Sequence, residues 1–299
     1  MHSIQIHAIQ TLPPNCINRG EHGEPKSARY GGVRRARVSS QSWKRAMRKT
    51  GFVEQETGQP GAVRSRRLLD HLKELLPEDK HDLAAQVIKD LYSAETVVLE
   101  SKPIIDALVR EVQTGSDAKA VVKAVATMPQ VPDVAVYGRM IADYPSRNVD
   151  GALHVAHAIS THASMVDLDY FTAVDDLLPP GDTGAAHLDV AEFQAGTMYR
   201  YALLNLDQLH HNLEEPALVA PTVRGVLRAF VLALPTGHQA QYAAYGRPAC
   251  VLAVVGEDAP VSLAGAFERP VRADLSAGGG YEAPSVQALI DHWTAIRTA

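Results

Sequence analysis

Cysteine and long apolar runs are scarce in this chain. Its 299 residues include two cysteines, Cys16 and Cys250, which lie far apart in the sequence. Because they form no C-x-x-C pair and no metal-ligand spacing, we expect neither a disulfide framework nor a bound metal. No apolar run approaches the ~20 residues that cross a bilayer, and the N-terminus lacks the features of a signal peptide. These absences predict a cytoplasmic protein that does not associate with membranes.

Acidic residues are missing from one basic segment. The whole chain has a formal net charge of −5 and a pI near 6.2, which do not suggest a nucleic-acid-binding protein. Between Lys26 and Lys49, however, nine lysines and arginines occur without an acid, which leaves −14 for the rest of the chain. A bare run of charge is often only a solvated surface. On an otherwise acidic chain, it also predicts a local site for an anionic partner.

Hydrophobic periodicity predicts a mixed α+β fold. The expected elements are a strand at 3–10, a polar loop at 15–32, a weakly alternating stretch at 33–38, a helix from 39 to 51, an entirely helical block at 63–127, strands at 131–140 and 152–159, a loop-like stretch at 160–192, a strand at 193–206, a helix at 216–234, a strand at 251–255 and a last helix at 286–296. This order suits a β-α-β-β-α-β core with insertions, the topology of RNA-recognition motifs. We find no aromatic RNP sequence of the kind that stacks bases. Any RNA binding is therefore expected to involve the sugar-phosphate backbone.

The start of the first helix is the expected anion site. Ser39, Ser40 and Gln41 stand where free N–H groups and the positive end of the helix dipole favour a phosphate. The cations expected on one side of this helix, facing solvent, are Lys44, Arg45 and Arg48. Trp43 and Met47 would form the buried side. Such donors and cations position a nucleic-acid strand without reading its sequence.

Histidines and aspartates elsewhere suggest other sites, which we weigh against structural roles. The residues concerned are His154, His157, His162, Asp167, Asp169, Asp175 and Asp176. His154 and His157 would face opposite sides of a strand, which favours hydrogen-bonding roles over a metal site. The aspartates could hold magnesium for RNA cleavage, but caps and solvated loop acids are the favoured interpretation. Tyr199 and Tyr201 are interpreted as strand packing rather than as base-stacking residues.

Specific motifs are spread along most of the chain. The most specific is Arg34-Arg35-Ala36-Arg37-Val38-Ser39-Ser40-Gln41, which is followed by Lys44-Arg45. The others are Ile4–His7, Cys16–Arg19, Tyr30–Gly32, Gly151–Leu153, Ala156–His162, Asp169–Leu177 and Phe193–Asn205. Together they resemble the CasC-type backbone subunit of the type I-E CRISPR Cascade complex, a member of the RAMP/RRM-like superfamily. The resemblance is weakest in the helical insertion.

The resemblance implies a hand-shaped subunit that is not an enzyme. Its RRM/ferredoxin-like palm would comprise residues 1–52 and 129–299, its helical finger insertion residues 53–128, and its β-hairpin thumb about 165–192. Several copies would stack along a CRISPR RNA, with target DNA and other Cascade subunits as further partners and no cofactor. Two alternatives stay open: a metal-dependent RNase of the type III backbone kind, and an oligomeric scaffold that binds no nucleic acid.

The resemblance also implies roles for individual residues. Those expected at the RNA are Asn18, Lys26, Arg34, Ser39, Ser40, Gln41, Lys44, Arg45, Arg48 and Met140. Met140 would lie near a kinked base and the thumb, which would wedge between segments of the guide–target duplex. Lys119 and Lys123 are all that this chain offers in place of a lysine-rich finger helix, so only a weak DNA contact is expected of them.

Overall fold

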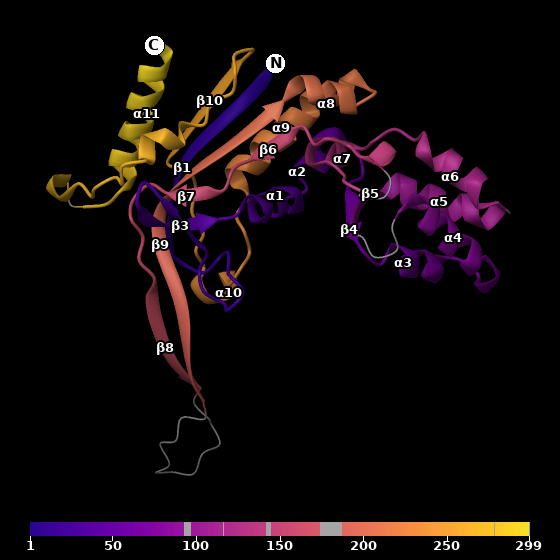
Figure 1. The fold of residues 1–299 in the computed structure, drawn as a ribbon, viewed down its shortest axis with the longest axis horizontal. Helices are drawn as coiled ribbons and strands as arrows, with labels where there is room; N and C mark the ends of the chain where they lie inside the picture. The colour runs from indigo at the N-terminus through magenta and orange to yellow at the C-terminus, as the bar shows by residue number, and fades with distance from the viewer. Residues whose placement is uncertain (93–96, 116, 142–144, 174–186, 278, 299) are drawn as a thin grey trace.

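The computed structural model describes residues 1–92, 97–115, 117–141, 145–173, 187–277 and 279–298 (Figure 1). Its strands are β1 (Ser3–Asn15), β2 (Ser27–Tyr30), β3 (Val33–Val38), β4 (Ala62–Ser65), β5 (Val98–Ser101), β6 (Leu153–Val155), β7 (Ala158–Ser160), β8 (Asp167–Ala173), β9 (His187–Asn205) and β10 (Cys250–Gly256). Its α-helices are α1 (Ser40–Lys49), α2 (Phe52–Thr57), α3 (Leu68–Leu75), α4 (His81–Leu91), α5 (Lys102–Thr114), α6 (Ala118–Ala126), α7 (Pro132–Tyr137), α8 (Leu206–Asn212), α9 (Val219–Leu232), α10 (Gln239–Tyr242) and α11 (Glu282–Thr298). Within the described residues, no helix combines the length and apolarity that crossing a membrane requires.

One antiparallel sheet forms the centre of the structure. In the described residues its strand order is β10-β1-β9-β7-β3-β2, and both β6 and β8 also pair with β9. Along the chain, β1, α1, β7, β9, α9 and β10 follow one another as the expected β-α-β-β-α-β core. The prediction of an α+β fold is therefore confirmed.

Helices cover both faces of this sheet. Ile6 on β1 belongs to a core that includes Phe230 of α9. Ile9, also on β1, belongs to a separate core with Leu263 and with Leu289 of α11. Successive side chains of a strand point to opposite faces, so both faces of β1 are covered and its first eight residues are all buried.

A second, mostly helical body lies to one side of the sheet, and we call it the finger (Figure 1). Its core includes Leu72 of α3, Leu91 of α4, Leu108 of α5 and Val121 of α6. A two-stranded antiparallel ribbon of β4 and β5 lies next to these helices. The prediction that 63–127 is entirely helical is wrong for this ribbon, because its strands pair across a long separation in sequence and no local hairpin signal marks them.

Residues 131–140 contain a helix rather than the predicted strand. Pro132 stands in the first turn of α7, a position that suits proline, and Gly138 ends the helix with a φ of 78°. Val134, Ala135 and Val136 are all fully buried, because α7 contacts α2, β5 and α8. A helix that is buried on all sides lacks the exposed polar face by which sequence periodicity recognises a surface helix.

A β-hairpin of β8 and the first half of β9 projects from the sheet (Figure 1). Its pairing runs from Asp167 opposite Phe193 to Ala173 opposite His187. The loop-like prediction for 160–192 is therefore wrong for residues 167–173 and 187–192. The polar loop predicted at 15–32 likewise contains β2, which pairs with β3.

Candidate nucleic-acid interface

Side chains from three segments cap the N-terminus of α1. Ser39 Oγ accepts a hydrogen bond from the Ser42 N–H at 3.3 Å, and the Ser39 N–H donates to Asn18 Oδ1 at 2.8 Å. The Ser40 N–H donates to Nδ1 of His157 at 3.3 Å. These bonds occupy N–H groups that were expected to be free for a phosphate. Asn18 and Ser39 therefore shape the helix start. His157 is a neighbour of the site that was not predicted from the sequence.

Exposed polar and cationic side chains follow along the outer side of α1. Arg45 and Lys49, four residues apart, are exposed, as is Gln41 near the helix start. Arg34 on β3 is also exposed, whereas Lys44 is partly buried and desolvation lowers the pKa of its amine. Among the described residues, no acid forms an ion pair with any of these four cations. Their charge is available to an anionic ligand.

Arg48 differs from the other cations of α1. Its Nε donates to Oδ2 of Asp133 on α7 at 2.8 Å, and its Nη2 bonds the backbone carbonyl of Ala62 on β4. Only 16% of the Arg48 side chain is exposed. The expectation that Arg48 faces solvent is therefore wrong. The side chain ties α1 to α7 and to the finger ribbon, because Asp133 is a buried acid that needs a cationic partner.

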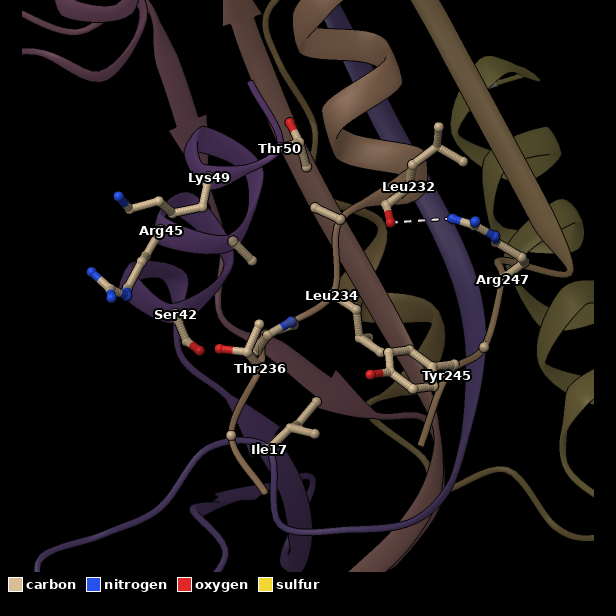
Figure 2. A pocket seen from close by; sticks show the side chains of 15 residues that line it. Ile17, Ser42, Arg45, Lys49, Thr50, Leu232, Leu234, Thr236, Tyr245 and Arg247 are labelled. Atoms are coloured by element: carbon tan, nitrogen blue, oxygen red, sulfur yellow. Dashed lines mark hydrogen bonds between the residues drawn. The ribbon is translucent and has the colours of Figure 1, made fainter. Parts of the chain in front are cut away.

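A groove that we call the palm groove runs along one side of α1 (Figure 2). It has a volume of about 680 Å³, and one wall consists of Ser42, Arg45, Ala46 and Lys49 of α1 and of Thr50, which follows the helix. The opposite wall comes from residues 232–237, at the end of α9 and just beyond it, and from Tyr245, Gly246 and Arg247. Tyr245 is 71% exposed, and Arg247 Nη1 donates to the Leu232 carbonyl at 3.1 Å. No local pattern in the sequence indicated that residues 245–247 return to α1.

A second groove, which we call the finger groove, lies between α1 and the finger ribbon. Its volume is about 420 Å³, and Arg45 and Lys49 line it as they line the palm groove. The ribbon side contributes Arg64 of β4 and Lys102, the first residue of α5. Neither Arg64 nor Lys102 was predicted as a site residue, because nothing local in the sequence indicates that the β4–β5 ribbon brings them opposite α1.

The remaining predicted residues lie at different distances from α1. Lys26 is next to Asn18, since its backbone N–H donates to the Asn18 carbonyl at 2.9 Å. Met140 is 78% exposed and follows the buried Arg139. Lys119 and Lys123 are exposed on α6 in the finger, apart from α1 (Figure 1). The structure thus brings Lys26 close to the start of α1 but does not bring the two finger lysines there.

His162 has a structural role. Its Nδ1 lies 2.8 Å from the Ala163 carbonyl, its Nε2 accepts from the Thr197 N–H at 3.1 Å, and its ring stacks on Tyr281 with centroids 3.7 Å apart. Burial lowers the pKa of His162, in keeping with a neutral ring. These contacts confirm the hydrogen-bonding interpretation of His162.

The structure shows the place of Tyr199 and of two of the four aspartates that were considered as metal ligands. Tyr199 is buried, and its hydroxyl bonds Nδ1 of His7 at 2.9 Å, which confirms the packing interpretation of Tyr199. Asp167 and Asp169 lie on β8, whereas Asp175 and Asp176 are outside the described residues. In the part of the chain that the structure describes, no three His, Cys, Asp or Glu side chains gather in a way that could hold a metal ion.

Two solved structures resemble this chain over nearly its whole length. A chain of a structure described as "CRISPR RNA-guided surveillance complex, pre-nicking" is 34% identical, with a TM-score of 0.87 over 99% of this chain and 89% of that chain. A chain of a structure described as "CRISPR RNA-guided surveillance complex" is 32% identical, with a TM-score of 0.68 over 99% of this chain and 84% of that chain. These matches support the resemblance that the sequence motifs indicated.

A family comparison agrees with these structural matches. The model of the family described as CT1975-like protein matches residues 4–299. A search of curated proteins found no significant match. Because the family model spans almost the entire sequence, the motif-based resemblance is confirmed, and the chain belongs to the CT1975-like protein family.

Proposed function

We propose that this chain is a non-catalytic backbone subunit of a type I-E CRISPR Cascade complex that binds the guide RNA along its phosphates. The observation that carries the proposal is the group of cations at α1 and β3 that have no acid partner among the described residues: Arg34, Arg45 and Lys49 are exposed and Lys44 is partly buried. Arg45 and Lys49 border two grooves. Such cations bind phosphates irrespective of the bases, as a guide of variable sequence requires.

Repetition of the subunit supplies affinity. Each phosphate contact with a single strand contributes about −0.7 to the slope of log K against log salt, so a few contacts per subunit bind weakly. Copies stacked along one RNA bind as a multivalent assembly. In this arrangement residues 1–52 and 129–299 form the palm and 53–128 the finger. The hairpin around 165–192 is the thumb, and exposed Met140 lies near a kinked base.

The same proposal includes target DNA and other Cascade subunits as partners. Lys119 and Lys123 are exposed on one helix, four residues apart, and would make a weak contact with DNA phosphates. Lys26, Arg34, Ser40, Gln41, Lys44 and Arg45 provide the RNA contacts around α1. Arg48 is left out of this RNA surface because Asp133 and Ala62 already hold its guanidinium.

RNA co-purification tests the proposal. In the full-length protein expressed together with a CRISPR array, Lys44→Gln with Arg45→Gln should lower the yield of bound RNA roughly tenfold, because two phosphate contacts are lost. The control is Arg269→Gln with Arg272→Gln, which removes two exposed cations beside Val271, a residue that packs on the core containing Leu263 and Leu289 rather than on α1. A wild-type yield of RNA from the α1 variant, or equal losses from both variants, would contradict the proposal.

A denaturing gel tests the proposal that the protein does not cleave RNA. Labelled target RNA incubated with the assembled protein and magnesium should stay intact. Specific cuts at regular intervals would instead favour the metal-dependent RNase of the type III kind.

A further inference from the structure

The finger groove concentrates positive charge from segments far apart in the sequence. Arg45 and Lys49 reach it from α1, Arg64 from β4 and Lys102 from the start of α5. All four residues are exposed. The chain as a whole carries a net charge of −5, so a groove with four cations on its walls is a local departure from its overall charge.

These four cations have no anionic partner within the protein as far as the structure describes it. None of them forms an ion pair in the described residues. Arg48 also lines the groove, but Asp133 neutralises it. The acid that lines the groove is Glu54, whose carboxylate lies against the backbone at Gly61. Like charges that face one another across a groove repel, and a bound polyanion would remove that repulsion.

The walls of the finger groove are held in place by specific bonds. In the β4–β5 ribbon, Arg64 pairs with Leu99, and the Lys102 N–H donates to the Gly61 carbonyl at 3.2 Å. The Ala62 N–H donates to Oδ2 of Asp133 at 2.9 Å, the same oxygen that accepts from Arg48 at 2.8 Å. The buried pair of Arg48 and Asp133 therefore fixes the ribbon relative to α1, so that Arg64 and Lys102 are positioned before any ligand binds.

The finger groove and the palm groove adjoin at α1, where they share lining residues. Arg45 and Lys49 line both grooves, and Figure 2 shows them extending side by side from α1, on the side away from Tyr245 and Arg247. Four residues of α-helix rise about 6 Å, so the two cations present successive charges along the helix. A strand that leaves the palm groove over the outer side of α1 meets Arg64 and Lys102 next.

We infer that the finger groove binds the phosphodiester backbone of a single nucleic-acid strand, with Arg64 and Lys102 of the ribbon facing Arg45 and Lys49 of α1. The inference rests on the proposed function and extends its binding surface from the palm helix to the base of the finger. The guide RNA and the target strand share this backbone chemistry, and the two arms of the experiment distinguish them.

The experiment measures the salt dependence of strand binding by the full-length protein. The variant is Arg64→Gln with Lys102→Gln, and the control is Lys73→Gln with Arg110→Gln, which removes the same charge from finger helices that do not line the groove. One arm uses labelled single-stranded RNA, and the other uses the RNA-loaded protein with complementary single-stranded DNA. The slope of log K against log salt should become less steep by about 1.4 for the groove variant, because two phosphate contacts are lost, and should not change for the control.

Each possible result either assigns the finger groove to one strand or excludes it as a binding site. A reduced slope in the RNA arm assigns the groove to the guide, and a reduced slope in the DNA arm alone assigns it to the target strand. Wild-type slopes in both arms, with wild-type RNA binding intact, overturn the groove but not the proposed function. Wild-type protein that binds no RNA overturns both. Thermal melting of the two variants, whose substituted side chains are exposed or half-exposed, checks that a lost slope does not reflect unfolding.

Discussion

Single arginines show why the charge of the basic segment overstates its binding surface. Arg35 is fully buried, and its guanidinium donates to the backbone carbonyls of Tyr30, Ser160 and Phe267. Arg48 is held by Asp133 in the same segment. Both residues count toward the run of nine cations, yet both stabilise the palm. A sequence records the charge of a side chain but not the partner that occupies it.

His7 is a buried neutral histidine in the palm. It has no exposed surface, and desolvation lowers its pKa to about 4 from an ordinary value of 6.5. The Leu263 N–H donates to the Tyr199 hydroxyl, which leaves that hydroxyl to donate to Nδ1 of His7. Between pH 6.5 and 4 the unfolded chain therefore binds a proton at His7 that the folded protein does not bind.

This difference predicts a loss of stability in acid. The contribution of His7 is complete above pH 6.5 and decreases as the pH falls, by about 2 kcal/mol at pH 5. We expect the free energy of unfolding in urea to fall between pH 7.5 and pH 5, and to fall less in His7→Gln. The lowered pKa values of His157 and His162 act in the same direction in both proteins. The quantity compared between wild type and His7→Gln is therefore the change in the free energy of unfolding from pH 7.5 to pH 5. An equal difference in both proteins would contradict the prediction.

At the scale of elements, one buried acid connects the finger ribbon to the segment that carries Met140. Glu100 on β5 accepts from Arg139 Nη1 at 2.7 Å and 2.9 Å and from Arg147 Nη2 at 3.1 Å, and it also accepts from the Tyr92 hydroxyl. Only 2% of the Glu100 side chain is exposed. The local sequence does not indicate these contacts of Glu100, because the three partner residues come from separate segments.

Glu100→Gln should therefore be strongly destabilising. It leaves Arg139 and Arg147 without their buried counter-charge, which costs about 3–5 kcal/mol. Urea denaturation checks this value. The matched control is Glu56→Gln, since Glu56 also bonds two arginines, Arg224 and Arg228, but both of these are exposed. The control should change stability much less. Similar losses in the two variants would show that burial does not set the strength of the Glu100 contacts.

At the scale of the whole molecule, the hairpin of β8 and β9 presents apolar side chains to solvent. Leu168 is 52% exposed and Tyr170 is 66% exposed, and the hairpin extends away from the sheet (Figure 1). Isolated exposed apolar residues are common, but several on one projecting element are typical of an interaction surface. In the proposed assembly this element is the thumb that reaches the next copy or the guide–target duplex.

Tyr170→Asp should reduce assembly on RNA. A charge at this position disfavours burial of the hairpin against a neighbour, so fewer copies should bind per RNA while the monomer melts at the wild-type temperature. Native mass spectrometry of the RNA complex measures the number of copies. Leu275→Asp, at a position that is 84% exposed elsewhere on the surface, should leave that number unchanged. Assembly that is unaffected by Tyr170→Asp would remove the hairpin from the interface.

Local patterns in the sequence were sufficient for the core of the fold. The alternation in β1, the serine before α1 and the periodicity of α9 predicted elements that the structure contains, in the order of a β-α-β-β-α-β core. They also located Gln41 and Arg45 on the exposed side of α1. These features depend on residues that are neighbours in sequence, where strand and helix periodicity act directly.

Contacts between distant segments decided the rest. Burial on all sides made α7 a helix where an apolar run predicted a strand, and pairing across the finger produced β4 and β5. Contacts between distant segments also paired Arg48 with Asp133. They brought Arg64 and Lys102 opposite Arg45 and Lys49. The sequence alone thus predicted β1, α1, β9, α9 and β10 of the palm, but not α7, β2 or β8. Only the tertiary structure decided which cations are free, because an ion pair or a groove wall depends on residues that meet in space.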